Sequence, residues 1–240
     1  MFSRQRMLAI LVSLAATTAE AQMMARDLGS FELQMGTIPG RSMAQGLVQP
    51  ASHGAFHGGL DLNHASGWYF GQWQPATGFA DGTLLELNSY LGYARPFAER
   101  PGYEVGVIRY TFPDLRAIDR HAFYGGLTLD RGRFGASVSH EPWRTDSTLL
   151  MDFDLSRYWG VDLSLKYSNH ALAHPAHLPG GRTLSSFNDW SLNLSRHWRS
   201  MQMGMTYTGT DVSGTGCMAY AGHNEHCEDF FMLRFEKTLR

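Results

Sequence analysis

The 240-residue sequence contains only two cysteines and no apolar run near the roughly 20 residues that a transmembrane helix requires. Its 20 basic and 22 acidic residues give a formal net charge of −2, which leaves no basic footprint for nucleic acid. Phosphate-loop, zincin and C-x-x-C redox motifs are also missing. These absences argue against a helical membrane protein, a nucleic-acid-binding protein and the common nucleotide, zinc and redox enzymes, and no cofactor is expected.

The N-terminus has the features of a secretory signal peptide. Two arginines precede an apolar run over residues 7–16, and Ala-Glu-Ala at 19–21 fits a cleavage site. We predict a signal peptide over residues 1–21. A single mature domain over residues 22–240 is expected, because β-barrels of this length often remain undivided.

The two cysteines, Cys217 and Cys227, lie close together in this exported chain. An oxidising periplasm favours pairing of such cysteines, so a disulfide that closes one loop is expected. A thiol or metal site is the alternative interpretation.

From about residue 54 onward, stretches of about ten residues alternate apolar and polar side chains and are separated by turn-forming residues. The clearest examples are residues 149–156 and 161–168. This pattern predicts an all-β protein, an antiparallel transmembrane β-barrel of about 12 strands. The predicted strands cover residues 31–36, 54–64, 67–74, 83–93, 102–112, 121–129, 133–140, 148–157, 160–168, 187–197, 201–209 and 229–239.

The predicted connections alternate in length. One set is mostly short and comprises residues 65–66, 94–101, 130–132, 158–159 and 199–200. The other set includes the three longest connections, at residues 37–53, 169–186 and 210–228. Because outer-membrane barrels have short periplasmic turns and longer extracellular loops, this arrangement predicts that both termini lie in the periplasm.

The apolar face of the predicted strands carries its polar exceptions only near strand ends. They are His64, Arg109, His140, Arg157 and Arg196. A lipid-facing surface requires this distribution, because an arginine costs about 2–4 kcal/mol at the bilayer midplane and little near an interface. A secreted β-sandwich shares the alternation but gives no reason for such confinement.

Aromatic residues on the predicted strands group at two levels. They are Trp68, Tyr93, Tyr103, Phe134 and Trp198 near the turns, and Phe56, Phe123, Tyr167, Trp190 and Tyr207 near the loops. Amphipathic rings favour the level of the lipid headgroups, so two aromatic girdles are predicted.

Several short motifs resemble those of a known family. Gly58-Gly59-Leu60-Asp61 is followed by Ser66-Gly67-Trp68-Tyr69 and by Gly71-Gln72-Trp73, and weaker similarities continue to Lys237. In this order and spacing, the motifs resemble exported Gram-negative proteins of the Gcw_chp type, also called the TorF family of porins. The resemblance implies an outer-membrane barrel with a porin role, and it supplies no catalytic residues.

If the apolar side chains face lipid, the intervening polar ones face the lumen. The charged residues predicted there are mostly acidic, and they are Asp61, Glu86, Glu104, Asp152, Asp154, Asp162, Lys166, Asp189, Arg234 and Glu236. Acidic linings favour cations, so a weak cation preference is predicted. Antiparallel pairing around a turn centred at Tyr158 would place Asp154 opposite Asp162. The alternative is a narrow lumen that hydrogen-bonded side chains plug.

Five histidines lie in the predicted loops 169–186 and 210–228, and they are His170, His174, His177, His223 and His226. Imidazoles at a pore mouth can bind zinc or copper. Their spacing matches no standard zinc motif, however, and no metal site is predicted.

His64-Ala65-Ser66 is similar to the H-x-S pair of some outer-membrane lipid hydrolases, in which the histidine activates the serine hydroxyl. The trio occupies a turn predicted on the periplasmic side, whereas those enzymes act on the outer leaflet. No third residue that would orient the histidine is evident, so enzymatic activity is not predicted.

The sequence thus predicts an outer-membrane barrel through which small polar solutes or ions diffuse passively. Its expected partners are outer-membrane lipid, these solutes and the barrel-assembly machinery. The chain ends on Leu239-Arg240 instead of the terminal aromatic residue that this machinery commonly reads. The alternatives are a non-conducting structural or adhesive barrel and a lipid hydrolase.

Overall fold

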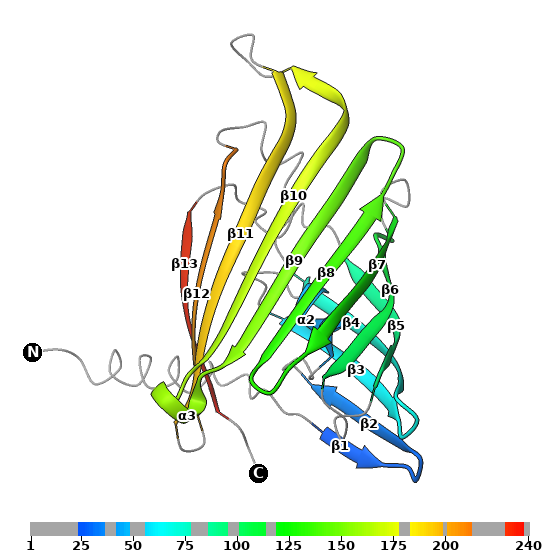
Figure 1. Cartoon of the computed structure of the whole chain (residues 1–240), viewed down its shortest axis with the longest axis vertical. Coiled ribbons are helices and arrows are strands. Elements are labelled where there is room, and N and C mark those ends of the chain that lie inside the picture. Colours follow the sequence, from blue (N-terminus) through cyan, green and yellow to red (C-terminus); the bar gives the residue numbers. More distant parts are fainter. Residues whose placement is uncertain are drawn as a thin grey trace, which may run out of the picture.

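The structure is a computed structural model that describes residues 24–36, 42–48, 56–77, 86–95, 101–113, 119–177, 183–198, 201–212 and 229–237. In these residues thirteen antiparallel strands form one sheet, in which each strand pairs with its neighbours in the sequence. Figure 1 shows that the sheet curls round a short helix on its concave side. Within the described part of the chain, no helix has the length and apolar character needed to cross a membrane.

The two longest strands, β10 and β11, have 16 residues each. The strands are β1 (Met24–Asp27), β2 (Phe31–Gly36), β3 (Phe56–His64), β4 (Trp68–Thr77), β5 (Leu87–Ala94), β6 (Gly102–Thr111), β7 (Arg120–Thr128), β8 (Gly132–His140), β9 (Arg144–Asp154), β10 (Asp162–His177), β11 (Thr183–Trp198), β12 (Met201–Thr210) and β13 (Phe230–Lys237). The helices are α2 (Met43–Val48) and α3 (Ser156–Trp159).

The twelve predicted strands correspond to β2 through β13, so the all-β antiparallel fold is confirmed. An additional strand, β1, pairs with β2 from Met24↔Met35 to Asp27↔Glu32. The turn between them contains Gly29, whose φ of 83° lies in the left-handed region and whose N–H donates to the Asp27 carboxylate at 2.8 Å. The sequence pattern missed β1 because four residues are too few to establish a period.

The predicted loop over residues 169–186 is wrong, because β10 continues to His177 and β11 begins at Thr183. The β10–β11 pairing is continuous as far as Ala171↔Ser186, and after a register shift it resumes at Ala176↔Leu184. In Figure 1 the β10–β11 hairpin extends beyond the neighbouring strands. Backbone hydrogen bonds do not require apolar side chains, so strand structure persists beyond the end of the alternating pattern.

On the same end of the sheet, β9 begins at Arg144, earlier than the predicted start at residue 148. Only residues 141–143 connect it to β8, and Glu141 and Arg144 exchange backbone hydrogen bonds of 2.8 and 3.3 Å. The end of the sheet that was predicted to carry long loops therefore includes one tight turn.

The predicted turn at residues 158–159 is a single helical turn, α3. Gly160 closes it with a φ of 68°, and the Gly160 N–H donates to the carbonyl of Ser156 at 2.9 Å. The chain then enters β10 with Asp162 directly opposite Asp154, as the sequence predicted.

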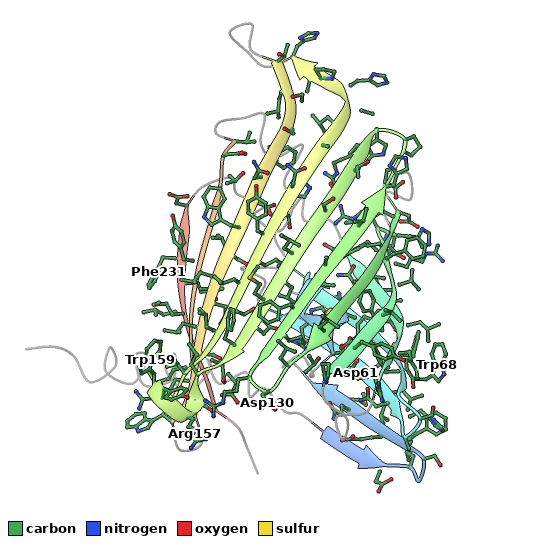
Figure 2. All side chains as sticks on the ribbon, in the orientation of Figure 1. Asp61, Trp68, Asp130, Arg157, Trp159 and Phe231 are labelled. Carbon is green, nitrogen blue, oxygen red and sulfur yellow. The ribbon has the colours of Figure 1, made fainter. Side chains whose placement is uncertain are left out.

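The two faces of the sheet differ in polarity. Phe123, for example, is 72% exposed, and Figure 2 shows Trp68 and Phe231 pointing away from the sheet. Large exposed apolar side chains on the convex face include Phe70, Leu91, Val105, Leu127, Val138, Leu149, Met151, Tyr167 and Leu233. The buried ionisable side chains of the concave face are Asp61, Glu104, Arg144, Lys166, His170 and Asp189. This is the reverse of the arrangement in a water-soluble protein.

The arginines and histidines that the sequence placed on the apolar face lie near strand ends. His64, Arg109, His140 and Arg196 are within three residues of a strand end, while Arg157 lies in α3. Neutral polar side chains such as Gln72 and Asn169 occur farther inside their strands on the same face.

Candidate functional site on the concave face

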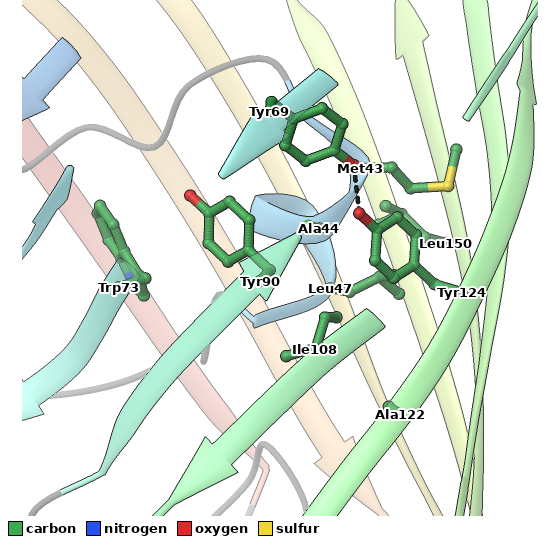
Figure 3. Close-up of a cluster of buried hydrophobic side chains, with 10 residues drawn as sticks. All are labelled: Met43, Ala44, Leu47, Tyr69, Trp73, Tyr90, Ile108, Ala122, Tyr124 and Leu150. Carbon is green, nitrogen blue, oxygen red and sulfur yellow. Dashed lines mark hydrogen bonds between the residues drawn. The ribbon is translucent and has the colours of Figure 1, made fainter. Parts of the chain in front are cut away.

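Helix α2 packs on the concave face, although its residues were predicted as part of the loop over residues 37–53. It contacts β4, β5, β6 and β9. Its Met43, Ala44 and Leu47 are buried in the cluster drawn in Figure 3. The sheet residues of this cluster are Tyr69, Trp73, Tyr90, Ile108, Ala122, Tyr124 and Leu150. The i, i+1, i+4 spacing of the three helix residues is a helical signal that the sequence does contain.

Charged side chains from two strands hold the two ends of α2. At the N-terminal end, the Glu104 carboxylate on β6 accepts the N–H of Met43 at 2.7 Å. At the C-terminal end, the Lys166 ammonium on β10 donates to the carbonyls of Leu47 at 3.1 Å and of Gly46 at 3.4 Å. These charges complement the partial charges at the helix ends. The helix thus connects β6 to β10 across the concave face.

Glycines in the sheet provide the space that Met43 occupies. A Cβ added at Gly135 would lie 2.3 Å from Met43 Sδ, and one added at Gly126 would lie 2.2 Å from Met43 Cε. On the helix itself, a Cβ added at Gly46 would lie 2.8 Å from Leu150 Cδ2. These glycines therefore allow α2 to approach the sheet closely.

Tyrosine hydroxyls satisfy the carboxylates near α2. Tyr69 donates to Glu104, and its hydroxyl also contacts that of Tyr124. Tyr90 donates to Asp61. Both acids in this region thus have partners within the protein.

Nearer the predicted loop end, the concave face carries five charged or ionisable side chains, which we call the charged band. They are Arg120, Arg144, Asp146, His170 and Asp189. The pair His170↔Asp146 lies four residues farther along the β9–β10 ladder than Lys166↔Leu150, which adjoins α2. The charged band and α2 therefore occupy successive levels of the concave face.

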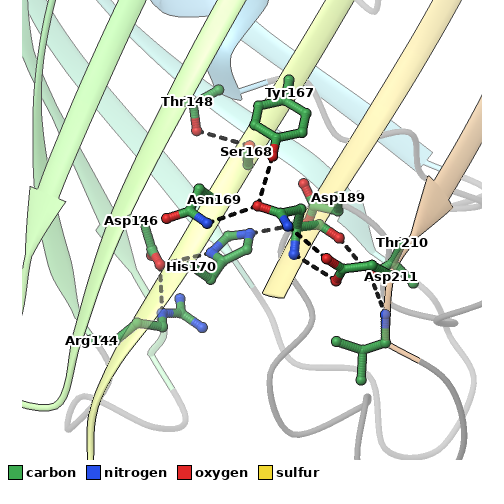
Figure 4. Close-up of polar contacts among 12 residues, drawn as sticks. Arg144, Asp146, Thr148, Tyr167, Ser168, Asn169, His170, Asp189, Thr210 and Asp211 are labelled. Carbon is green, nitrogen blue, oxygen red and sulfur yellow. Dashed lines mark hydrogen bonds and ion pairs between the residues drawn. The ribbon is translucent and has the colours of Figure 1, made fainter. Parts of the chain in front are cut away.

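Ion pairs connect the members of the charged band, as Figure 4 shows for four of them. Arg144 Nε lies 2.8 Å from Asp146 Oδ1, and Arg120 Nη1 lies 3.6 Å from Asp146 Oδ2. His170 bridges two acids, with Nδ1 2.7 Å from Asp146 and Nε2 3.1 Å from Asp189, which is 1% exposed. An imidazolium can donate to both carboxylates, so the band can form a continuous network.

Aromatic rings support the cations of the charged band. The guanidinium of Arg120 lies 4.5 Å from the ring centre of Tyr110, and that of Arg144 lies 4.8 Å from the ring of Trp143. The His170 ring stacks on Phe187 at 4.5 Å. Such contacts stabilise cations and restrict their orientations.

The charged residues predicted for the lumen occupy several environments. Asp152 is half-buried and pairs with Arg133 at 2.5 Å, while the exposed Asp154 and half-buried Asp162 lie at the turn end. Glu86 is half-buried just before β5. Those buried on the concave face are Asp61, Glu104, Lys166 and Asp189. The side chains of Arg234 and Glu236 lie outside the described residues.

Sequence reasoning missed four charged residues of this face. Arg120, Arg144 and Asp146 lie just outside the predicted strands 121–129 and 148–157, and Arg133, the first residue of a predicted strand, was not counted. A strand assignment extended by a few residues would have placed them correctly. With three additional arginines, the concave face is less acidic than the sequence tally suggested.

The predicted loop histidines do not gather at a pore mouth in the described residues. His170 is buried in β10 within the charged band, and His174 and His177 are exposed farther along the same strand. Within the described part of the chain, no group of three histidine, cysteine or acidic side chains is arranged so that it could hold a metal ion. His223, His226, Cys217, Cys227 and the predicted signal peptide at 1–21 lie outside the described residues.

His64 and Ser66 are in contact, with His64 Nδ1 2.7 Å from Ser66 Oγ. The same Nδ1 accepts the backbone N–H of Ser66 at 3.1 Å, and Gly67 follows with a φ of 100°. Both contacts span two residues within the β3–β4 turn. The geometry is that of a local turn motif.

Comparisons with known proteins identify the family. A family model described as "Bacterial protein of unknown function (Gcw_chp)" matches residues 42–239, and the chain belongs to this family. No curated protein sequence matches the chain. The crystal structure of Pseudomonas aeruginosa OpdK with vanillate aligns with a TM-score of 0.40 and 12% identity, covering 88% of this chain and 65% of that chain. A similarity at this level carries no argument about function.

Proposed function

We propose that this member of the Gcw_chp family is an outer-membrane β-barrel whose lumen lets small polar solutes diffuse passively. The observation that carries the proposal is the reversed polarity of the sheet, with apolar side chains exposed outside and ionisable side chains buried inside. An apolar surface this extensive is unfavourable in water and suits lipid. Export by the predicted signal peptide at 1–21 is part of the proposal.

The convex face has further features that support a membrane location. Its arginines and histidines lie near strand ends, where a charge costs least in a bilayer. At the turn end, Trp68 packs on Tyr93 with ring centres 5.4 Å apart, and Tyr93 packs on Tyr103 at 6.2 Å. A row of aromatic rings at one level is typical of a membrane interface. On this proposal the short turns face the periplasm.

The charge distribution supports only weak ion selectivity. Acidic residues on the concave face still outnumber the arginines and Lys166, but most of them are paired with a cation or a tyrosine. A paired carboxylate attracts a passing ion less than a free one. We therefore expect a modest preference for cations and passage limited mainly by the width that α2 leaves.

Conductance in planar bilayers tests the function. Refolded protein that has inserted should give stable current steps, and reversal potentials in a salt gradient should show cations permeating more readily than anions. Anion preference would refute the proposed selectivity. Inserted protein that never conducts would refute the channel.

The second candidate is a non-conducting structural barrel, and the apolar packing of α2 specifically favours it. Met43, Ala44 and Leu47 are all buried against the sheet, as in a permanent core. Removal of α2 distinguishes the two functions. A channel that α2 narrows conducts when α2 is present and conducts more when α2 is removed. A structural barrel carries no current when α2 is present.

A further inference from the structure

Helix α3 presents two aromatic side chains directly to its surroundings. Tyr158 is 67% exposed and Trp159 is 71% exposed, and α3 contains no buried residue. Figure 2 shows Trp159 and Arg157 projecting from the turn end of the sheet. Exposing two large rings to water is unfavourable, so this turn has the composition of an interaction surface.

Three exposed arginines surround these rings. The guanidinium of Arg131, in the β7–β8 turn, lies 5.0 Å from the ring centre of Tyr158. Arg196 of β11 lies beside the end of α3, since a Cβ added at Gly160 would lie 3.7 Å from Arg196 Nε. Arg157 is part of α3 itself. Residues from three different elements thus bring positive charge to one place.

Three carboxylates also lie near this turn, and two of them belong to the concave-facing sets of their strands. Asp154 accepts the Ser156 N–H at 2.9 Å and belongs to the concave-facing set of β9. Asp130 adjoins Arg131 in the sequence. Asp162, directly opposite Asp154, belongs to the concave-facing set of β10, whereas Arg196 belongs to the convex-facing set of β11. The Asp154 and Asp162 side chains thus lie toward the concave side of the turn, and the Arg196 guanidinium lies toward the convex side, where a lipid phosphate can reach it.

The apolar convex face continues beside α3. Phe153 of β9 packs on Phe134 of β8 with ring centres 5.5 Å apart, and Trp198 near the end of β11 is exposed. Aromatic rings next to an apolar belt, with arginines around them, match the layers of a lipid monolayer from acyl chain to phosphate. Guanidinium groups bind phosphate oxygens in a bidentate manner.

From this arrangement we propose that α3, with Arg131, Arg157 and Arg196, forms a binding site for the phosphate headgroup of an anionic phospholipid. The proposal rests on the membrane location proposed above. The rings of Tyr158 and Trp159 lie at the headgroup level, and the three arginines contact the lipid phosphate. The site anchors the turn end of the barrel in the adjoining leaflet.

The test compares full-length protein in vesicles of phosphatidylcholine with protein in vesicles that also contain phosphatidylglycerol. Resistance to unfolding in the gel-mobility assay first establishes insertion, and failure at this step counts against the membrane location. For inserted wild-type protein, phosphatidylglycerol should raise the unfolding temperature. Absence of this increase would overturn the lipid site.

Variants of the three arginines test whether the increase in unfolding temperature comes from this site. The triple substitution Arg131→Gln, Arg157→Gln and Arg196→Gln should remove at least half of it. The matched control is Arg109→Gln, an exposed arginine at the other end of the sheet, which should retain it. If the triple variant does not insert, Arg157→Gln alone is measured and should also reduce the increase. Full retention in whichever of these two variants inserts would overturn the proposal.

Two further measurements separate lipid from free phosphate. Inorganic phosphate added to phosphatidylcholine vesicles should not reproduce the stabilisation, and if it does, the lipid assignment is wrong. Lipids brominated near the headgroup should quench wild-type fluorescence more than that of Trp159→Phe. Equal quenching would show that Trp159 does not contact lipid.

Discussion

The two levels of the concave face are held together by different physical forces. Around α2, apolar side chains and tyrosines are packed at close distance, with Glu104 and Lys166 only at the helix ends. In the charged band, Asp146 of β9 forms ion pairs with Arg144 on the same strand and with His170 on β10. On the proposed function, shape determines how much room the α2 level leaves, and charge determines which ions pass the charged band.

The largest effect is expected for Asp146→Asn in the charged band. Asp146 is the acid that Arg120, Arg144 and His170 share, and removing one partner of a buried ion pair costs about 3 kcal/mol. The surplus of positive charge should also shift selectivity toward anions. Denaturant unfolding in vesicles and reversal potentials measure the two effects. The exposed Asp154→Asn should change neither, and equal behaviour of the two variants would contradict the role of the band.

The next effect concerns shape at the α2 level. Gly135→Val introduces a Cβ whose close contacts are all with Met43 side-chain atoms, so Met43 must leave its position against the sheet and the protein loses about 1–3 kcal/mol. Single-channel conductance should fall, because the displaced Met43 end of α2 extends farther into the lumen. The control is Gly125→Val, where the nearest atom to the new Cβ is Val105 Cγ1 at 3.5 Å. Unchanged conductance in folded Gly135→Val would mean that α2 does not limit flow.

A smaller effect is expected for Lys166→Met, which keeps a long apolar chain but removes the ammonium at the end of α2. Losing its hydrogen bonds to Gly46 and Leu47 should cost about 1–2 kcal/mol. The loosened helix should increase current noise more than it changes ion selectivity. Lys166→Arg should restore quiet currents, and a Lys166→Met channel as quiet as the wild type would rule out this anchoring role.

The smallest effect is expected for Arg120→Gln. Its contact with Asp146 is 3.6 Å and partly exposed, so it contributes about 0.5 kcal/mol. A small loss of selectivity should be measurable at low salt and should vanish at high salt, because mobile ions screen the charge. A salt-independent change would indicate that Arg120 acts through packing on Tyr110 instead.

The convex face was predictable from sequence, and much of the concave face was not. The apolar convex face has a strict period of two, which identified the strands, and antiparallel pairing about the turn at Tyr158 predicted the opposition of Asp154 and Asp162. Polar residues that pair on the concave face have no such periodic pattern in the sequence. His170 was therefore predicted in a loop, although it lies in β10. The position of α2 depends on space left by Gly126 and Gly135, more than 70 residues away in the sequence. Only three-dimensional packing reveals such space.

The contacts of α2 also have a consequence for how the chain folds. Strand pairing in the described sheet joins sequence neighbours only, and such local hairpins close rapidly. Lys166, by contrast, meets the carbonyl of Gly46 across 120 residues, and Glu104 meets Met43 across 61. Helix α2 precedes β10 in the sequence, so its C-terminal end can contact Lys166 only after β10 has formed. Docking of α2 is therefore a long-range event that cannot finish before β10 has formed, and it should be slower than the pairing of neighbouring strands into hairpins.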